Sequence, residues 1–114
     1  MVKFFLCVLL AATVNAQGNS AHGKDLFLKY SCYACHGFSG QNGPGARLVP
    51  MKIAQVGFIA YVRNPPRPNQ MPSYSAKAVP DGDMADIYAY LKSLPDSAPS
   101  AKSVPLLNQI LAAP

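Results

Sequence analysis

Cys32-Tyr33-Ala34-Cys35-His36 is the stretch that decides the fold of this chain, because C-x-x-C-H is the spacing at which haem is attached covalently to proteins. On one helical turn, positions i, i+3 and i+4 share a face, so Cys32, Cys35 and His36 can all contact one flat ligand. We expect the two thiols to form thioethers with the porphyrin and the imidazole to bind the iron. The motif therefore predicts one covalently bound haem c.

Two other chemistries also use paired cysteines at this spacing. A structural zinc site requires four nitrogen or sulfur ligands, and His22 is the only further candidate near the motif. A thioredoxin-like redox pair requires a βαβ setting, yet no strand-like alternation surrounds Cys32, and residues 37–45 form a Gly-rich loop. This loop also lacks the Gly-Lys-Ser/Thr ending of a phosphate-binding loop. The pattern therefore favours haem over zinc, thiol redox chemistry or nucleotide binding.

Residues 1–16 have the pattern of a secretory signal peptide. Lys3 supplies the positive end, an apolar run follows, and Val14-Asn15-Ala16 has the small residues of a cleavage site. The run is shorter than the ~20 apolar residues of a membrane-spanning helix, and no later segment reaches that length. We therefore expect a mature chain that starts at Gln17, has no transmembrane segment and works in the periplasm.

The distribution of charge argues against nucleic acid as a partner. The chain has 10 Lys and Arg residues against 5 acidic residues, a formal net charge of +5. The basic residues are scattered, without the cluster or aromatic platform that nucleic-acid binding uses. Such a mildly basic surface suits brief, salt-sensitive encounters with acidic redox proteins.

Apolar periodicity predicts helices and no strands. One helix is expected to be capped by Asn19 or Ser20 and to lead into the haem motif, and another covers residues 53–63. The clearest helical stripe follows Pro80 and ends before Pro95. We expect an all-α fold in which three to four short helices and their loops wrap around the haem.

The chain divides into a haem domain over residues 17–95 and a tail over residues 96–114. The tail is rich in Pro, Ser and Ala and then contains an apolar segment over residues 104–111. This segment either packs back on the haem domain or stays loosely ordered, or else it docks onto a larger partner protein. The sequence leaves these alternatives open.

A haem iron with one imidazole ligand has a second axial position, and we expect Met71 to fill it. Met71 follows a Pro-rich segment and precedes Pro72, and such a stiff chain suits the placement of an axial thioether. Met51 and Met84 are the competing thioethers, but Met84 belongs to the apolar stripe of the last helix and is better explained as core. His22 would give a bis-imidazole iron, which its place near the start of the first helix disfavours.

The order of signal segment, helix, haem motif, loop, Met71-Pro72 and final helix resembles that of small bacterial class I cytochromes c. The resemblance covers about residues 20–95. It implies the class I cytochrome c fold around one haem. It also implies that Gly23 and Phe27 of the first helix pack against residues of the last helix such as Tyr88 and Leu91.

The resemblance carries one departure and two further roles. The glycine and the aromatic residue of the first helix stand one residue further from the first cysteine than in this family, which predicts a small irregularity at Ser31. Pro44 matches the family's proline whose carbonyl accepts a hydrogen bond from the proximal imidazole, here His36, and so fixes the ring. Arg63 falls where an arginine of the family often approaches a haem propionate.

With His36 and Met71 both bound, the iron has no open position and exchanges electrons only at the haem edge. We therefore expect an electron carrier and not an enzyme, with a dehydrogenase or quinol-oxidising complex as donor and an oxidase or another cytochrome as acceptor. Two alternatives stay open: a cytochrome subunit of a larger periplasmic dehydrogenase, and an open-haem gas-binding or peroxidase-like protein. The second lacks a visible distal acid–base pair, because the chain has no Glu and one spare histidine.

Overall fold

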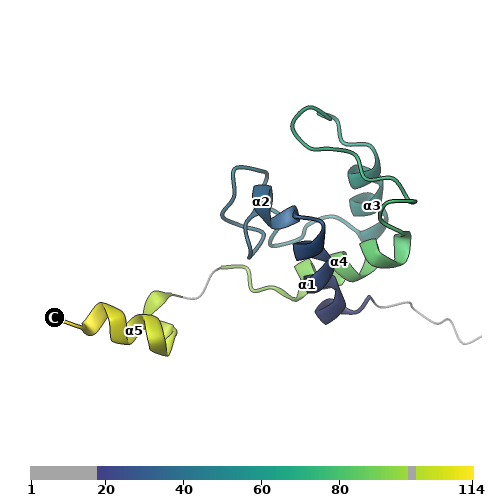
Figure 1. Cartoon of the computed structure of the whole chain (residues 1–114). Coiled ribbons are helices and arrows are strands. Elements are labelled where there is room, and N and C mark those ends of the chain that lie inside the picture. Colours follow the sequence, from purple (N-terminus) through teal and green to yellow (C-terminus); the bar gives the residue numbers. More distant parts are fainter. Residues whose placement is uncertain (1–17, 98–99) are drawn as a thin grey trace, which may run out of the picture.

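The computed structural model describes residues 18–97 and 100–114, and this part of the chain is helical (Figure 1). Its elements are α1 (Ser20–Lys29), α2 (Cys32–His36), α3 (Gln55–Arg63), α4 (Asp81–Ser93), the 3-10 helix η1 (Ala101–Ser103) and α5 (Pro105–Ala112). The described residues contain no strand, which confirms the all-α prediction. The predicted signal peptide over residues 1–16 and the start at Gln17 lie outside the described residues.

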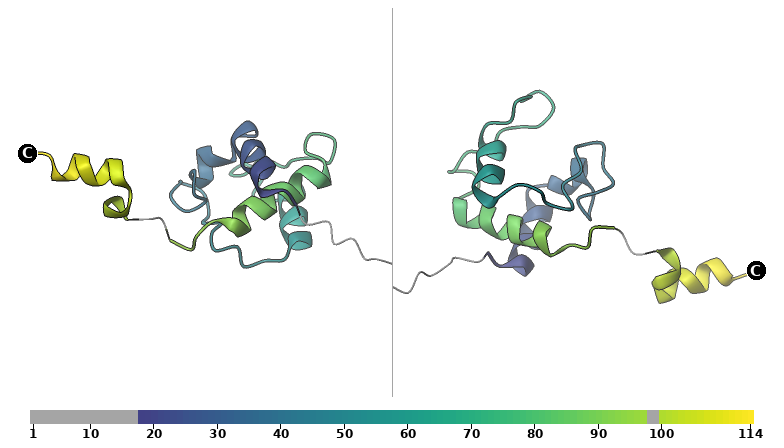
Figure 2. Two further views of the ribbon diagram at one scale, coloured as in Figure 1. Left: turned by 90° about the horizontal axis from the view of Figure 1, so that it is seen from below. Right: turned by 180° about the vertical axis from the view of Figure 1, so that it is seen from behind.

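The fold centres on the crossing of α1 and α4 (Figures 1 and 2). Gly23 is buried on α1 and lies so close to α4 that a Cβ at this position would overlap the backbone carbonyl of Asp86. One turn later the ring of Phe27 packs against that of Tyr90, with 5.5 Å between the ring centroids. The missing side chain at Gly23 therefore lets the two helices approach closely enough to bury Phe27, which is 1% exposed.

Tyr90, rather than the predicted Tyr88, is the aromatic partner of Phe27. Residues two apart on a helix point about 200° apart around its axis, so these two tyrosines face opposite sides of α4. Tyr88 packs against Phe58 of α3 with 5.6 Å between the ring centroids and donates its hydroxyl to the Ile53 carbonyl at 2.8 Å. One side of α4 thus holds α1 and the other holds α3.

The core joins α1, α3 and α4 with the loops between them. Its buried side chains are Leu26, Phe27, Val49, Phe58, Val62, Val79, Met84, Ile87, Tyr90 and Leu91. Met84 is 2% exposed, which confirms that it is a core residue. Small domains bury a limited share of their surface, so a bound apolar cofactor would enlarge this core substantially.

Asp86 of α4 ties down the N-terminus of α1. One of its carboxylate oxygens accepts a hydrogen bond from the Asn19 backbone N–H at 2.6 Å, and the other lies 2.7 Å from His22 Nδ1. The Asn19 side chain caps α1 by accepting a hydrogen bond from the His22 N–H at 3.1 Å, as the sequence predicts. The hydrogen bond between the side chains raises the pKa of His22 and lowers that of Asp86.

We expect this contact to make the stability of the protein depend on pH. Because the pKa of His22 is raised in the folded state, its contribution is complete below the ordinary value of 6.5 and is lost as the pH rises through the folded-state pKa. The charges of Asp83 and Asp25 act in the same direction. Because the pKa of Asp86 is lowered, the contribution of Asp86 is lost as the pH falls below the ordinary 3.8 and through its folded-state pKa.

Urea unfolding of the wild type and His22→Gln between about pH 5 and about pH 9 checks this expectation. The difference in free energy of unfolding between the two proteins should be largest at the acidic end and should shrink at the alkaline end. Any other titrating group contributes to both proteins and cancels in the difference. A difference that is constant over this range would contradict a charged His22–Asp86 contact.

The tail forms helix α5, which lies apart from the α1–α4 body in all three views (Figures 1 and 2). Among the described helices, α5 contacts only η1. Its large exposed apolar side chains are Leu106, Leu107, Ile110 and Leu111. Packing of this segment against the helices of the haem domain is therefore not observed. No helix in the described part of the chain combines the length and apolar character needed to cross a membrane.

Candidate haem-binding site

Helix α2 presents the haem motif on one helical turn. It is separated from α1 by Tyr30 and Ser31. Ser31 is the one non-glycine residue of the described chain with a left-handed backbone, at φ 58° and ψ 26°. The Tyr30 N–H still bonds the Leu26 carbonyl at 2.9 Å, and α2 starts anew with the Ala34 N–H bonded to the Ser31 carbonyl at 3.1 Å. The structure confirms the predicted irregularity, because the additional residue is accommodated at Ser31.

Cys32 and Cys35 are both free thiols on this turn. Cys32 is partly buried and Cys35 is exposed. Burial raises the pKa of the Cys32 thiol above its ordinary 9.0, so this group is neutral at physiological pH. The two thiols are unpaired and stand at the spacing that thioether attachment of haem requires.

His36 is held by a backbone carbonyl of the loop that follows it. Its Nδ1 lies 2.7 Å from the carbonyl oxygen of Ala46. A carbonyl oxygen can only accept a hydrogen bond, so Nδ1 carries the proton and Nε2 keeps its lone pair for a metal. The loop thereby selects the form of the imidazole that acts as a neutral metal ligand.

The prediction that the Pro44 carbonyl accepts the hydrogen bond from the His36 imidazole is wrong, because the Ala46 carbonyl accepts it instead. The loop folds back against α2, where the Gly45 N–H donates to the Cys35 carbonyl at 2.6 Å. A Cβ at Gly43 would overlap that same carbonyl, so only glycine allows this approach. Pro44 is used in the turn itself, with its side chain exposed, and the carbonyl two residues later, that of Ala46, reaches Nδ1.

Met71 lies in the loop between α3 and α4. It is half-buried and packs against the core, and its N–H donates to the Arg67 carbonyl at 3.0 Å. Met51, the competing thioether, is also half-buried against the core. Burial alone therefore does not distinguish the two candidate thioethers, whereas it assigns Met84 to the core.

Arg63 is the last residue of α3, and its guanidinium is hydrogen-bonded to other residues of the chain. Nη1 donates to the Tyr74 carbonyl at 2.9 Å, and Nη2 lies 2.5 Å from Asp81 Oδ1. The side chain of Arg63 is 14% exposed. A contact with a haem propionate, as the resemblance implies, would have to form beside these two contacts or replace one of them.

Tyr74 lies close to α2, which carries the haem motif, and to the loop that carries Met71, although no sequence motif points to it. Burial raises the pKa of its phenol, and the charge that Cys32 and Cys35 carry once they are deprotonated acts in the same direction. The phenol therefore lies near α2, while the Tyr74 N–H donates to the Val62 carbonyl at the end of α3 at 3.1 Å. Only an aromatic residue shortly after Met71 marks this position in the sequence.

The donor set of these residues fits a haem. Two free thiols and an imidazole with a free Nε2 share one turn, and thioether side chains come from two other segments. The partly buried apolar side chains around the core include Tyr33, Leu48, Met51, Ile59, Met71 and Tyr74. The described residues contain no group of three or more His, Cys, Asp or Glu side chains that could hold a metal ion. The pair of thiols with an imidazole one residue later is the donor set that attaches and ligates an iron porphyrin.

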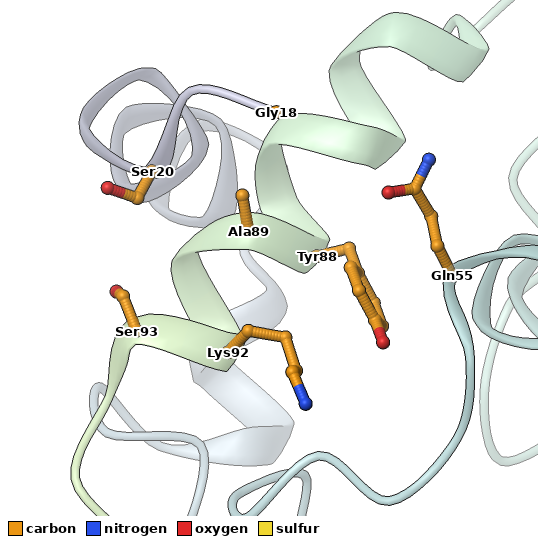
Figure 3. A pocket seen from close by; sticks show the side chains of 7 residues that line it. All are labelled: Gly18, Ser20, Gln55, Tyr88, Ala89, Lys92 and Ser93. Carbon is orange, nitrogen blue, oxygen red and sulfur yellow. The ribbon is translucent and has the colours of Figure 1, made fainter. Parts of the chain in front are cut away.

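Two surface clefts are lined by residues other than the candidate haem ligands. One follows α4 and is lined by Gly18, Ser20, Gln55, Tyr88, Ala89, Lys92 and Ser93 (Figure 3). The other is lined by Arg47, Val49, Pro50 and Lys52. Neither lining includes a residue of the haem motif or Met71. Chemistry and hydrogen bonding, rather than an enclosed cavity, identify the site in this structure.

Comparison with known protein families agrees with this assignment. The family model described as "Cytochrome C oxidase, cbb3-type, subunit III" matches residues 18–91. The match includes α1, α2, α3 and most of α4, and it ends before the tail that carries α5. The comparison with curated proteins found no match, and neither did the comparison with solved structures.

Proposed function

The chain belongs to the cytochrome family described as cytochrome c oxidase, cbb3-type, subunit III, and we propose that it is a periplasmic one-electron carrier whose iron is bound by His36 and Met71. Family membership gives a covalently bound haem c and a role in electron transport. The axial ligands, the compartment and the redox partners are the proposed part.

One observation carries the proposal: the haem motif is present together with the hydrogen bond that orients its imidazole. We assign thioether attachment to Cys32 and Cys35, which are free and share the turn of α2 with His36. The hydrogen bond from His36 Nδ1 to the Ala46 carbonyl fixes the plane of the ring and leaves Nε2 free, so this nitrogen would bind the iron. A ring held in this way loses little freedom on binding the metal.

Met71 is the proposed second axial ligand. Its half-buried position beside the core and its turn with Arg67 support a thioether held in place before the cofactor binds. When bound, haem c supplies reversible Fe(II)/Fe(III) chemistry, and a neutral thioether favours Fe(II) more than a second imidazole does. With both axial positions taken by the chain, small molecules have no site on the iron. The chain's residues then serve to hold the cofactor and to exclude other ligands.

The proposed partners are redox proteins. A dehydrogenase or a quinol-oxidising complex would be the donor, and an oxidase or another cytochrome would be the acceptor. The name of the family refers to an oxidase subunit, which supports a partner of the oxidase class. We further propose that residues 17–95 form the haem domain and that residues 96–114 form a tail outside it.

Optical spectroscopy of the protein matured with a c-haem assembly system tests the proposal. We expect a c-type spectrum when reduced, the weak far-red sulfur-to-iron band when oxidised, and no response of the ferrous form to carbon monoxide. Haem should stay with the chain under acidic organic extraction, and a Cys32→Ala/Cys35→Ala double variant should lose it. A spectrum without the far-red band, together with ready binding of carbon monoxide, would instead support the open-haem alternative.

A further inference from the structure

The loop between α3 and α4 has few backbone hydrogen bonds of its own. Of residues 64–73, which project from the body after α3 (Figure 1), Gln70 and Met71 donate to the Arg67 carbonyl, both at 3.0 Å, and Asn64 donates to Ala60 at 3.1 Å. Prolines at positions 65, 66, 68 and 72 have no N–H to donate. The position of Met71 therefore depends on how the two ends of this loop are anchored.

The loop is closed at Tyr74. The Tyr74 N–H donates to the Val62 carbonyl at 3.1 Å, and the Tyr74 carbonyl accepts a hydrogen bond from Arg63 Nη1 at 2.9 Å. Both backbone groups of Tyr74 are thus held by consecutive residues at the end of α3. Since Tyr74 follows Met71 by three residues, this closure fixes the side of the loop that carries the thioether.

Arg63 extends the closure to α4. Its Nη2 lies 2.5 Å from Oδ1 of Asp81, the first residue of α4. One planar guanidinium therefore connects three segments: the end of α3, the loop after Met71 and the start of α4. The Asp81 side chain is 74% exposed, so solvent screens this ion pair.

We propose that Arg63 is a positioning residue for the axial thioether: by holding the Tyr74 carbonyl and Asp81, it keeps Met71 at the iron. This inference rests on the proposed assignment of Met71 as the ligand. Without the guanidinium, the Tyr74 carbonyl loses its partner, the loop after α3 opens more often, and Met71 leaves the iron in a larger fraction of molecules. The attachment of the haem through α2 is unaffected, because Arg63 contacts neither cysteine.

The test compares haem-loaded wild type, Arg63→Gln and Arg67→Gln. Arg67 is the matched control, since it is an exposed arginine of the same loop and its substitution removes the same charge. The bond from the Met71 N–H is to the Arg67 backbone carbonyl, which the substitution keeps. We expect Arg63→Gln to retain covalent haem but to bind carbon monoxide roughly tenfold to hundredfold faster than wild type, as loss of a charge-assisted hydrogen bond predicts. Its far-red band should also disappear at a lower temperature than the helical circular dichroism. Arg67→Gln should behave like wild type.

Two conservative variants sharpen the test. Arg63→Lys keeps the charge but has no planar fork, so we expect partial rescue of the far-red band. Asp81→Asn removes only the screened ion pair and should have a smaller effect than Arg63→Gln.

The outcomes separate the positioning role from the ligand assignment. Equal rates of carbon monoxide binding in Arg63→Gln and Arg67→Gln would overturn the positioning role, as would a changed potential with no change in carbon monoxide binding, which is the signature of a propionate contact. Parallel loss of the far-red band and of helical structure would reduce Arg63 to a general stabilising residue. If the wild type itself lacks the far-red band and binds carbon monoxide readily, the assignment of Met71 fails, and that result does not depend on Arg63.

Discussion

Replacing Gly23 by Ala should destabilise the protein severely, although alanine is the better helix former. A Cβ at this position overlaps the backbone carbonyl of Asp86 on α4, and a backbone cannot move aside as the end of a flexible side chain can. The helices would have to separate, which would loosen the packing of Phe27 against Tyr90 and stretch the hydrogen bond from the Asn19 N–H to Asp86. We expect a loss of about 3 kcal/mol, at the upper end for an overpacked core.

Gly57→Ala is the matched control for this substitution. Gly57 lies within α3, and a Cβ there meets no atom within 4 Å. The same chemical change should therefore stabilise the protein by roughly 0.5–1 kcal/mol, through helix propensity alone. Guanidinium unfolding of both haem-loaded variants, followed by circular dichroism, gives the two free energies. Equal effects of the same sign at Gly23 and Gly57 would contradict the close approach of α1 and α4.

The helices were predictable because each has a local cause. Prolines end α3 and precede α4, the Asn19 side chain caps α1, and apolar residues recur at helical spacing. The break at Ser31 was also predictable, since the glycine and the aromatic residue of α1 stand one residue further from the first cysteine than the resemblance requires. These features depend on residues close together in the sequence.

The contact between the His36 side chain and a backbone carbonyl ten residues later was not predictable in the same way. Any carbonyl of the loop after His36 can accept from its Nδ1, and the choice of Ala46 over Pro44 depends on how Gly43 and Gly45 fold against α2. A sequence shows that a loop is rich in glycine, but it does not show which carbonyl the turn presents.

Two further features depend on the assembled fold. The contact between Arg63 and the Tyr74 carbonyl joins residues from two segments, and an arginine beside a proline-rich loop shows nothing of its partner. The tail sequence predicts an apolar segment, but only the structure shows that this segment is the helix α5. The large apolar side chains of α5 are exposed, and among the described helices α5 contacts only η1. Such an unpaired apolar face is compatible with the alternative in which the protein is a subunit of a larger complex.

Met71→Ala should abolish the far-red band of the oxidised protein and open the iron to carbon monoxide. Alanine has no donor atom, so the second axial position would be free or taken by solvent, and the preference for Fe(II) given by the thioether would disappear. We expect a fall in potential on the order of 0.1 V, a modest part of the roughly 0.8 V over which axial ligands tune haem proteins. Covalent haem should be retained, because Cys32 and Cys35 lie on α2.

Met51→Ala is the decisive comparison, because Met51 is also a half-buried thioether packed against the core. If Met71 is the ligand, Met51→Ala lowers stability by about 1–2 kcal/mol, less than at a fully buried position, but it keeps the far-red band and the potential. The opposite result, with the band lost in Met51→Ala and kept in Met71→Ala, would move the axial ligand to the segment before α3. Because both substitutions remove the same side chain beside the same core, a difference in spectrum reports coordination and not packing.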